Sequence, residues 1–316
     1  MSSASAPHVV LGAAGGTGSA VVLELVTRGL PVRAVTRSGA TDVPAGVEQL
    51  AADVATPEGA RRACAGAGVV YHCAQPGYPK WVELFPGLTR AVLDGSAEAG
   101  AKLVFADNLY VYGPPDGPMT EETPLRAQGP KGRTRVEMAE AVLRAHSEGR
   151  LRCTIGRSSD YYGPRGTGTT AGDSIMKPAL RGKRARWLGS LDQPHTLNYL
   201  EDMGRALVTL GVRDEADGQV WHLAGRGTPH RAAVPDAGVR GGRVPAETRR
   251  RVPPDDPVGW PVQPRRAGAG RDPLPVPAAL RLGRSKFQAE FGPFEPMPHP
   301  EAVRRTVAWF RRQYAA

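Results

Sequence analysis

A glycine-rich turn between a short apolar run and an amphipathic stretch constrains this chain more than any other feature. The segment VVLGAAGGTGSA places three glycines, three residues apart, after a predicted strand at 8–12 and at the start of a predicted helix at 17–29. Glycines permit the tight turn and let backbone N–H groups approach a pyrophosphate, and the helix N-terminus adds partial positive charge. A glycine-rich turn without a ligand is the alternative. The residues expected to bind a dinucleotide here are Gly12, Gly15, Gly16, Thr17 and Gly18.

The first half of the chain alternates strand and helix patterns. Short apolar runs are followed by stretches with apolar residues at helical spacing. Strands are predicted at 31–37, 47–53, 68–74, 101–107, 152–157 and 218–225, helices at 80–99, 133–148 and 300–313, and a strand that turns into a helix at 194–212. This pattern is typical of an α/β fold with a doubly wound, mostly parallel sheet of the Rossmann type, here with about seven strands. We expect residues 1–155 to form a dinucleotide-binding core and 156–316 a smaller substrate-binding region, interleaved with the last core strands.

Residues 226–280 depart from this pattern. The segment is rich in proline, arginine and glycine and shows neither strand nor helix periodicity, so it cannot bury much apolar surface. We interpret it either as a long flexible insertion or as a stretch read out of frame from a GC-rich coding sequence. It also carries much of the net charge of +10, with ten arginines against four acidic residues between Arg226 and Arg271. Because nucleic-acid footprints are usually basic faces on folded elements, we expect no nucleic-acid partner.

Cysteine usage and the N-terminal residues bear on the cellular compartment. Cys64, Cys73 and Cys153 lie far apart, which predicts neither a disulfide framework nor a zinc site, and no other metal is expected. The start, MSSASAPHVV, has no basic and apolar signal pattern, and no run of about 20 apolar residues suggests a membrane span. These features predict a soluble protein of the cytoplasm that does not bind membranes.

The residues after the predicted strands indicate which dinucleotide is bound. An acidic residue after the second strand would bind the ribose 2′-OH of NAD, but the chain has Val-Thr-Arg-Ser there, and Arg37 could pair with a 2′-phosphate. NADP(H) is therefore the preferred cofactor, and NAD is the alternative in which Arg37 is merely solvated. Asp53 and Val54 are placed to meet the adenine, and Ala74 and Gln75 to border the ribose beside the nicotinamide.

Several motifs in fixed order resemble the extended short-chain dehydrogenase/reductase superfamily, in its NAD-dependent epimerase/dehydratase branch. They are GAAGGTG, the strands with AAD and YHCAQP, VYGP (111–114), GRSSDYYGP (156–164) and HTLNYLEDMGRAL (195–207). The resemblance covers about residues 8–225, and FGPFEPMPHPEAVRRTVAWFR resembles the C-terminal end of such proteins. It implies a Rossmann-type fold and a nicotinamide cofactor but does not identify a substrate.

The resemblance also implies catalytic residues that this chain does not keep. Such enzymes have a serine or threonine just before V-Y-G and a later Y-x-x-x-K, in which the tyrosine exchanges a proton with the substrate and the lysine lowers that tyrosine's pKa. Asn108 occupies the serine position, and Lys131 and Arg135 occupy the Y-x-x-x-K spacing. An asparagine can donate an N–H to a substrate oxygen but cannot act as an acid or base. Lys131 could hold a ribose hydroxyl or pass a proton, and Arg135 could bind anionic oxygens.

Other side chains are weaker candidates. Tyr78, Tyr161 or Tyr162 could replace the missing tyrosine, although each fits a structural or substrate-wall role better; Tyr78 is taken as the catalytic candidate and Tyr162 as a substrate contact. Arg157 begins the RSSDYYGP loop and could meet the substrate or form an ion pair. His195 lies on a strand that lines the substrate cleft in relatives, so it too could contact the substrate or be structural.

Two functions follow from this pattern. The first is an NAD(P)-dependent oxidoreductase, or a redox-assisted epimerase/dehydratase, with altered proton-transfer residues and a small carbonyl, hydroxyl or sugar-like substrate. The second is a catalytically impaired NADP(H)-binding sensor or regulator, because a fold does not entail activity. The partner expected in either case is a small molecule, and a homodimer is the assembly considered.

Overall fold

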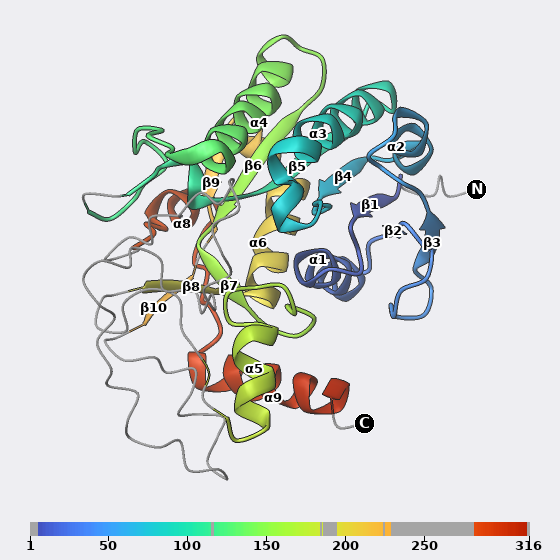
Figure 1. Cartoon of the computed structure of the whole chain (residues 1–316). Coiled ribbons are helices and arrows are strands. Elements are labelled where there is room, and N and C mark those ends of the chain that lie inside the picture. The colour runs from blue at the N-terminus through green and yellow to red at the C-terminus, as the bar shows by residue number, and fades with distance from the viewer. Residues whose placement is uncertain are drawn as a thin grey trace.

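The computed structural model describes residues 6–114, 117–183, 185, 195–223, 225–228 and 281–314. Two units stand out in this part of the chain (Figure 1): a larger one built on a parallel sheet, and a smaller one beside the carboxyl ends of its strands. Most of the segment 226–280, for which the sequence allowed an insertion or an out-of-frame stretch, lies outside the described residues.

Seven strands form the main sheet in the described part of the chain, in the order β3-β2-β1-β4-β5-β6-β9. Every neighbouring pair is parallel. The strands are β1 (His8–Leu11), β2 (Val32–Thr36), β3 (Glu48–Ala51), β4 (Val69–His72), β5 (Lys102–Asn108), β6 (Cys153–Ser158) and β9 (Val220–His222). The order reverses between β1 and β4, so the doubly wound parallel fold predicted from the sequence is confirmed.

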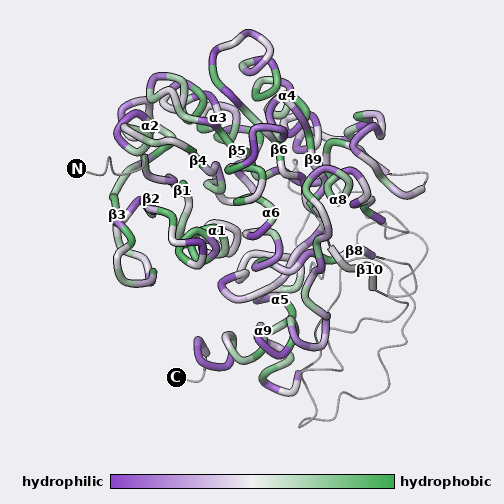
Figure 2. Tube along the Cα trace, turned by 180° about the vertical axis from the view of Figure 1, so that it is seen from behind, coloured by the Kyte–Doolittle hydropathy of each residue, from purple (hydrophilic) through white to green (hydrophobic). Residues whose placement is uncertain are grey.

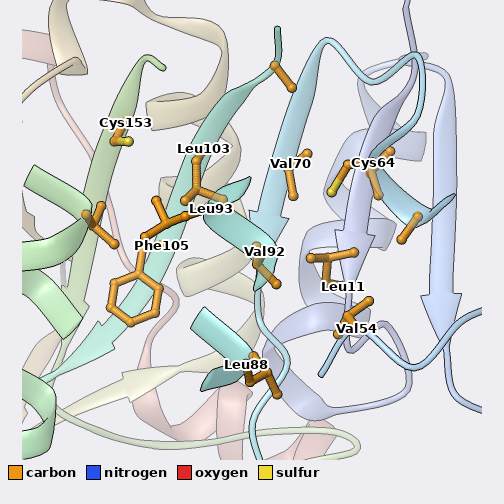
Figure 3. Close-up of a cluster of buried hydrophobic side chains, with 14 of the residues drawn as sticks. Leu11, Val54, Cys64, Val70, Leu88, Val92, Leu93, Leu103, Phe105 and Cys153 are labelled. Atoms are coloured by element: carbon orange, nitrogen blue, oxygen red, sulfur yellow. The ribbon is translucent and has the colours of Figure 1, made fainter. Parts of the chain in front are cut away.

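Helices cover both faces of this sheet (Figure 1). On one face lie α1 (Gly16–Thr27), α6 (Leu200–Val212) and α8 (Ser285–Phe291), and on the other lie α2 (Pro57–Cys64), α3 (Trp81–Glu98) and α4 (Gly129–Ser147). Figure 3 shows the second of these interfaces, where Leu103 and Phe105 of β5 and Val92 and Leu93 of α3 belong to one buried cluster. Strands buried on both faces explain the near-continuous apolar runs in the sequence.

The smaller unit combines a short mixed sheet with two helices. Its strands are β7 (Asp160–Tyr162), β8 (His195–Tyr199) and β10 (Arg226–Thr228), and its helices are α5 (Asp173–Leu180) and α9 (His299–Tyr314). Strand β8 pairs in parallel with β7 and antiparallel with β10. Figure 2 shows that hydrophilic and hydrophobic residues alternate along α9. The buried residues of this helix, Val303, Val307 and Phe310, pack into the smaller unit.

The sequence predicted most core elements to within a few residues but missed several later ones. Helix α4 begins at Gly129, four residues before the predicted start at 133, so Lys131 lies in its first turn. Strands β7 and β10 and helix α5 were not predicted, because each is short and has no clear periodicity. Within the described residues, none of the helices has the length and apolarity that crossing a membrane requires.

Candidate active site

The glycine turn after β1 has room for a ligand on one side only. Gly12 has φ +78, and a Cβ there would lie 2.8 Å from the backbone of Ala74. A Cβ on Gly18 would lie 2.2 Å from the Gly12 carbonyl oxygen. Gly15 has φ −77 and ψ 164, and its Cβ would meet only that same oxygen, at 3.4 Å. Helix α1 begins at the next residue, and the first N–H groups of a helix have no partner within it. The turn therefore fits a pyrophosphate.

The residues after β2 and β3 lie on the adenosine side of this turn. Thr36 ends β2, and its Oγ1 is buried with no hydrogen-bond partner among the described residues. Arg37 follows it and is exposed. After β3, Asp53 is exposed and its carboxylate accepts a hydrogen bond from the N–H of Ala55 at 3.1 Å, whereas Val54 is buried. The exposed Arg37 directly follows the end of β2, the strand end that lies near the adenosine ribose in dinucleotide-binding folds of this kind.

The ends of β4 and β5 lie next to each other at the same edge of the sheet. Ala74 and Gln75 follow β4, and Asn108 ends β5. The Asn108 Oδ1 accepts a hydrogen bond from the N–H of Tyr110 at 3.2 Å and so caps the following turn. Because its oxygen is engaged, the NH₂ group is the end of this amide that can serve a substrate oxygen.

Lys131 and Arg135 differ sharply in their surroundings, although both come from α4. The Nζ of Lys131 lies 4.4 Å from the centre of the Tyr78 ring. Arg135 is only 3 % exposed, and its guanidinium is 2.8 Å from the carboxylate of Asp107. It also packs 4.9 Å from the ring of Phe85. The expectation that Arg135 binds substrate oxygens therefore needs correction, because its charge is already paired inside the protein.

Asp107 holds a second buried arginine. The Nε of Arg157 is 2.8 Å from Asp107, and another nitrogen of the same guanidinium donates to the Tyr112 hydroxyl at 2.7 Å. The Tyr112 hydroxyl is in turn 2.6 Å from Nε2 of His222. Arg157 is 2 % exposed. Of the two roles considered for Arg157, the structure has the ion pair, so the predicted substrate contact is wrong.

Two buried histidines beside this network predict a pH effect on stability. Burial lowers the pKa of His72 and of His222 to about 3 from the ordinary 6.5. Between pH 6.5 and 3 the unfolded chain therefore binds protons that the folded protein does not, and stability falls as the pH falls. Each histidine should cost about 2 kcal/mol between pH 7 and 5. Urea unfolding at pH 7 and at pH 5 measures the loss of unfolding free energy. In His222→Gln this loss should be smaller by about 2 kcal/mol. An unchanged loss in the variant would contradict the assignment.

Tyr162 and His195 occupy different positions in the smaller unit. Tyr162 is fully buried, and its hydroxyl is 2.8 Å from Nδ1 of His299. It cannot line an open cleft, so its predicted substrate contact is wrong. The Nε2 of His195 is 2.9 Å from Asp160, whose other oxygen accepts a hydrogen bond from Thr170 at 2.9 Å. His195 thus has a structural partner in Asp160, which is itself partly exposed, and a substrate contact remains a prediction.

Tyr110, which the sequence analysis did not select as a candidate, lies beside Tyr78, whose ring contacts Lys131. The Tyr110 hydroxyl forms a hydrogen bond with Tyr78, and burial, together with the nearby Tyr78 and Asp160, raises the pKa of Tyr110. Tyr161 lies close enough to Tyr110 for the two hydroxyls to influence each other. Tyr110 stands two residues after Asn108, which was the one available sequence signal for it. Its contact with Tyr78 joins distant segments and could not be foreseen.

The donor set in this region does not suggest a metal. Within the described ranges there is no group of three or more histidine, cysteine or acidic side chains placed to hold a metal ion. The polar groups at the sheet edge are amides, hydroxyls and cations, which suit a phosphate-bearing organic ligand better than a cation.

Known proteins share the sequence pattern and the fold of this chain. The model of the family described as "NAD dependent epimerase/dehydratase family" matches residues 8–224. The chain belongs to this family. The resemblance seen in the sequence motifs is thereby confirmed, as is the class of nicotinamide-dependent oxidoreductases and epimerases/dehydratases. A search among curated proteins found no match.

Solved structures of similar fold extend over nearly the whole chain. A double mutant of DesIV, a dTDP-glucose 4,6-dehydratase from Streptomyces venezuelae, with NAD and DAU bound, has a TM-score of 0.77 at 18% identity, and the match covers 98% of each chain. UDP-glucose 4-epimerase from Thermotoga maritima, with UDP-glucose, has a TM-score of 0.75 at 20% identity and covers 97% of this chain and 99% of its own. MoeE5, in complex with UDP-glucose and NAD, has a TM-score of 0.73 at 21% identity, with the same coverage. At these identities the likeness concerns the fold.

Proposed function

We propose that this member of the family is an NADP(H)-preferring oxidoreductase, or redox-assisted epimerase/dehydratase, with atypical proton-transfer residues. The observation that carries the proposal is the alignment of three features along one sheet edge: a glycine turn open on one side, the exposed Arg37 directly after β2, and the amides of Gln75 and Asn108. In doubly wound sheets, dinucleotides bind across this edge at the point where the strand order reverses.

Each part of this edge has a proposed role toward the cofactor. The first N–H groups of α1, at Gly16 to Gly18, bind the pyrophosphate, and Arg37 binds the 2′-phosphate. Asp53 and Val54 border the adenine, and the Ala74–Gln75 backbone borders the second ribose. When bound, the cofactor supplies hydride chemistry that no side chain provides.

The substrate side is assigned to groups near the end of β5. The Asn108 NH₂ donates to a substrate oxygen and stabilises the negative charge that develops there. Lys131, in the first turn of α4, binds a ribose hydroxyl or an anionic group of the substrate. The substrate is a small carbonyl or hydroxyl compound; sugar nucleotides such as UDP-glucose, which MoeE5 and the Thermotoga epimerase carry in their structures, are the first class to test.

Cofactor preference provides the direct test. Replacing Arg37 by aspartate should shift the ratio of the NADPH and NADH dissociation constants toward NADH by about 100-fold or more. The reason is that an ion pair to the 2′-phosphate is lost and a carboxylate is offered to the ribose 2′-OH. Quenching of protein fluorescence by NADPH and NADH measures both dissociation constants. Arg62→Asp, at an exposed arginine of α2, is the matched control for the change of charge. Unchanged discrimination in Arg37→Asp would refute the NADP assignment.

The second candidate function, a sensor or regulator that binds NADP(H), is favoured by one observation. None of the three usual catalytic positions keeps its residue, and Arg135 at the lysine position is buried and paired with Asp107. Both functions require NADPH binding, but only the enzyme turns over substrate. Binding without turnover across a panel of carbonyl compounds and nucleotide sugars would favour the sensor.

A further inference from the structure

The structure separates the three tyrosines that could replace the missing proton donor. Tyr162 is fully buried and bonded to His299, on the side of β7 that faces away from the main sheet. Tyr78 is 39% exposed, and its ring lies under Lys131. Tyr161 is the neighbour of Tyr162 in β7, so its side chain points to the opposite face of the strand, toward the main sheet.

The groups around the Tyr161 hydroxyl come from the edge that the cofactor would occupy. The pKa of Tyr161 is raised, first by burial and also by the nearby Asp160, while the positive charge of Arg135 and a hydrogen bond from Gln75 oppose this rise. Cys73, at the end of β4, is also within electrostatic reach. Gln75 is the residue assigned above to the ribose beside the nicotinamide. The hydroxyl therefore stands where the nicotinamide and the substrate would meet.

We propose that Tyr161, supplied by β7 of the smaller unit, is the proton donor and acceptor of the reaction and takes the place of the tyrosine missing from α4. Arg135 is a positioning residue in this arrangement. Its guanidinium, fixed by Asp107 at 2.8 Å, provides the nearby positive charge that a lysine provides in relatives and that a phenolate requires. The inference rests on the proposed function, because it assumes a nicotinamide at the same edge.

The proton and electron balance of the step is simple. In the reducing direction the O–H bond of Tyr161 breaks, and a new O–H bond forms on the substrate carbonyl oxygen. A bound reduced nicotinamide would supply the hydride that the carbonyl carbon requires, so the substrate would be reduced to an alcohol and the cofactor oxidised. The Tyr161 phenolate then regains a proton from water, and Asn108 holds the substrate oxygen throughout.

The first test compares two neighbouring tyrosines. Tyr161→Phe keeps the ring and removes only the hydroxyl, so kcat should fall by about 100-fold or more while the NADPH dissociation constant stays within about threefold. Tyr162→Phe is the matched control and should keep kcat within about threefold, since its hydroxyl bonds to His299 on the face of β7 away from the main sheet. Activity retained in Tyr161→Phe, or lost in Tyr78→Phe or Tyr110→Phe instead, would overturn the proposal.

A second readout does not depend on turnover. In protein with carbon-13-labelled tyrosine rings, the signal missing from Tyr161→Phe should shift when NADP⁺ is added, because a positive nicotinamide approaches that hydroxyl. The signal missing from Tyr162→Phe should not move. A Tyr161 signal indifferent to saturating NADP⁺ would overturn the inference even for an active wild type. Failure to bind NADP⁺ at all would instead count against the proposed function, and Tyr161 would fall with it.

Discussion

Replacing Asp107 by alanine should destabilise the protein by about 4 kcal/mol, the largest loss of stability that we expect from one substitution. Its carboxylate is the shared anion of Arg135 and Arg157, each 2.8 Å away, and both guanidiniums are almost fully buried. Without it two positive charges stay in the interior without their counterion. The free energy of unfolding from urea titration at pH 7 measures the effect.

An exposed ion pair provides the control. Arg150 and Asp94 are 2.7 Å apart, but both side chains are about half exposed. Because water already solvates such charges, Asp94→Ala should change the unfolding free energy by less than about 0.5 kcal/mol. Equal effects of Asp107→Ala and Asp94→Ala would show that the buried network adds nothing, and would also weaken the positioning role given to Arg135.

The ion pairs of Asp107 show which contacts sequence analysis could not determine. Asp107 and Arg157 lie in register near the ends of adjacent parallel strands. The sequence left an ion pair open for Arg157 but did not identify Asp107 as its partner. The second partner of Asp107, Arg135, comes from helix α4, which starts earlier than predicted. Because Arg135 aligns with the catalytic lysine of relatives, we predicted a substrate contact for it and not an ion pair. Residue identity at a motif position does not reveal whether a side chain is already paired.

The core elements were predictable because their signals lie within single short segments of the sequence. Buried parallel strands such as β4 and β5 are short apolar runs in the sequence itself, and the glycine spacing after β1 permits few conformations. The tyrosine group could not be predicted in the same way. Tyr78, Tyr110 and Tyr161 belong to three segments that only the folded chain brings together, and β7 is too short to show a period.

Replacing Gly15 by alanine should weaken NADPH binding by about 30-fold or more while the apoprotein remains folded. Alanine adopts the φ and ψ of this residue without strain, and its Cβ would meet only the Gly12 oxygen, at 3.4 Å. The methyl group would instead stand in the open side of the turn and keep the pyrophosphate from the backbone N–H groups, at a cost of about 2 kcal/mol of binding. Titration calorimetry with NADPH measures the change.

Two other glycines show whether this loss comes from the ligand or from the fold. In Gly18→Ala the Cβ would lie 2.2 Å from the Gly12 oxygen, so the turn itself must shift, and thermal unfolding should reveal a loss of about 1–3 kcal/mol together with weaker binding. Gly87→Ala, in α3 with no atom within 4 Å of the added Cβ, should leave binding unchanged and stabilise the helix by about 0.5–1 kcal/mol. If Gly15→Ala binds NADPH as tightly as Gly87→Ala does, the open side of the turn is not the pyrophosphate site, because a methyl group there could not be accommodated beside a bound diphosphate.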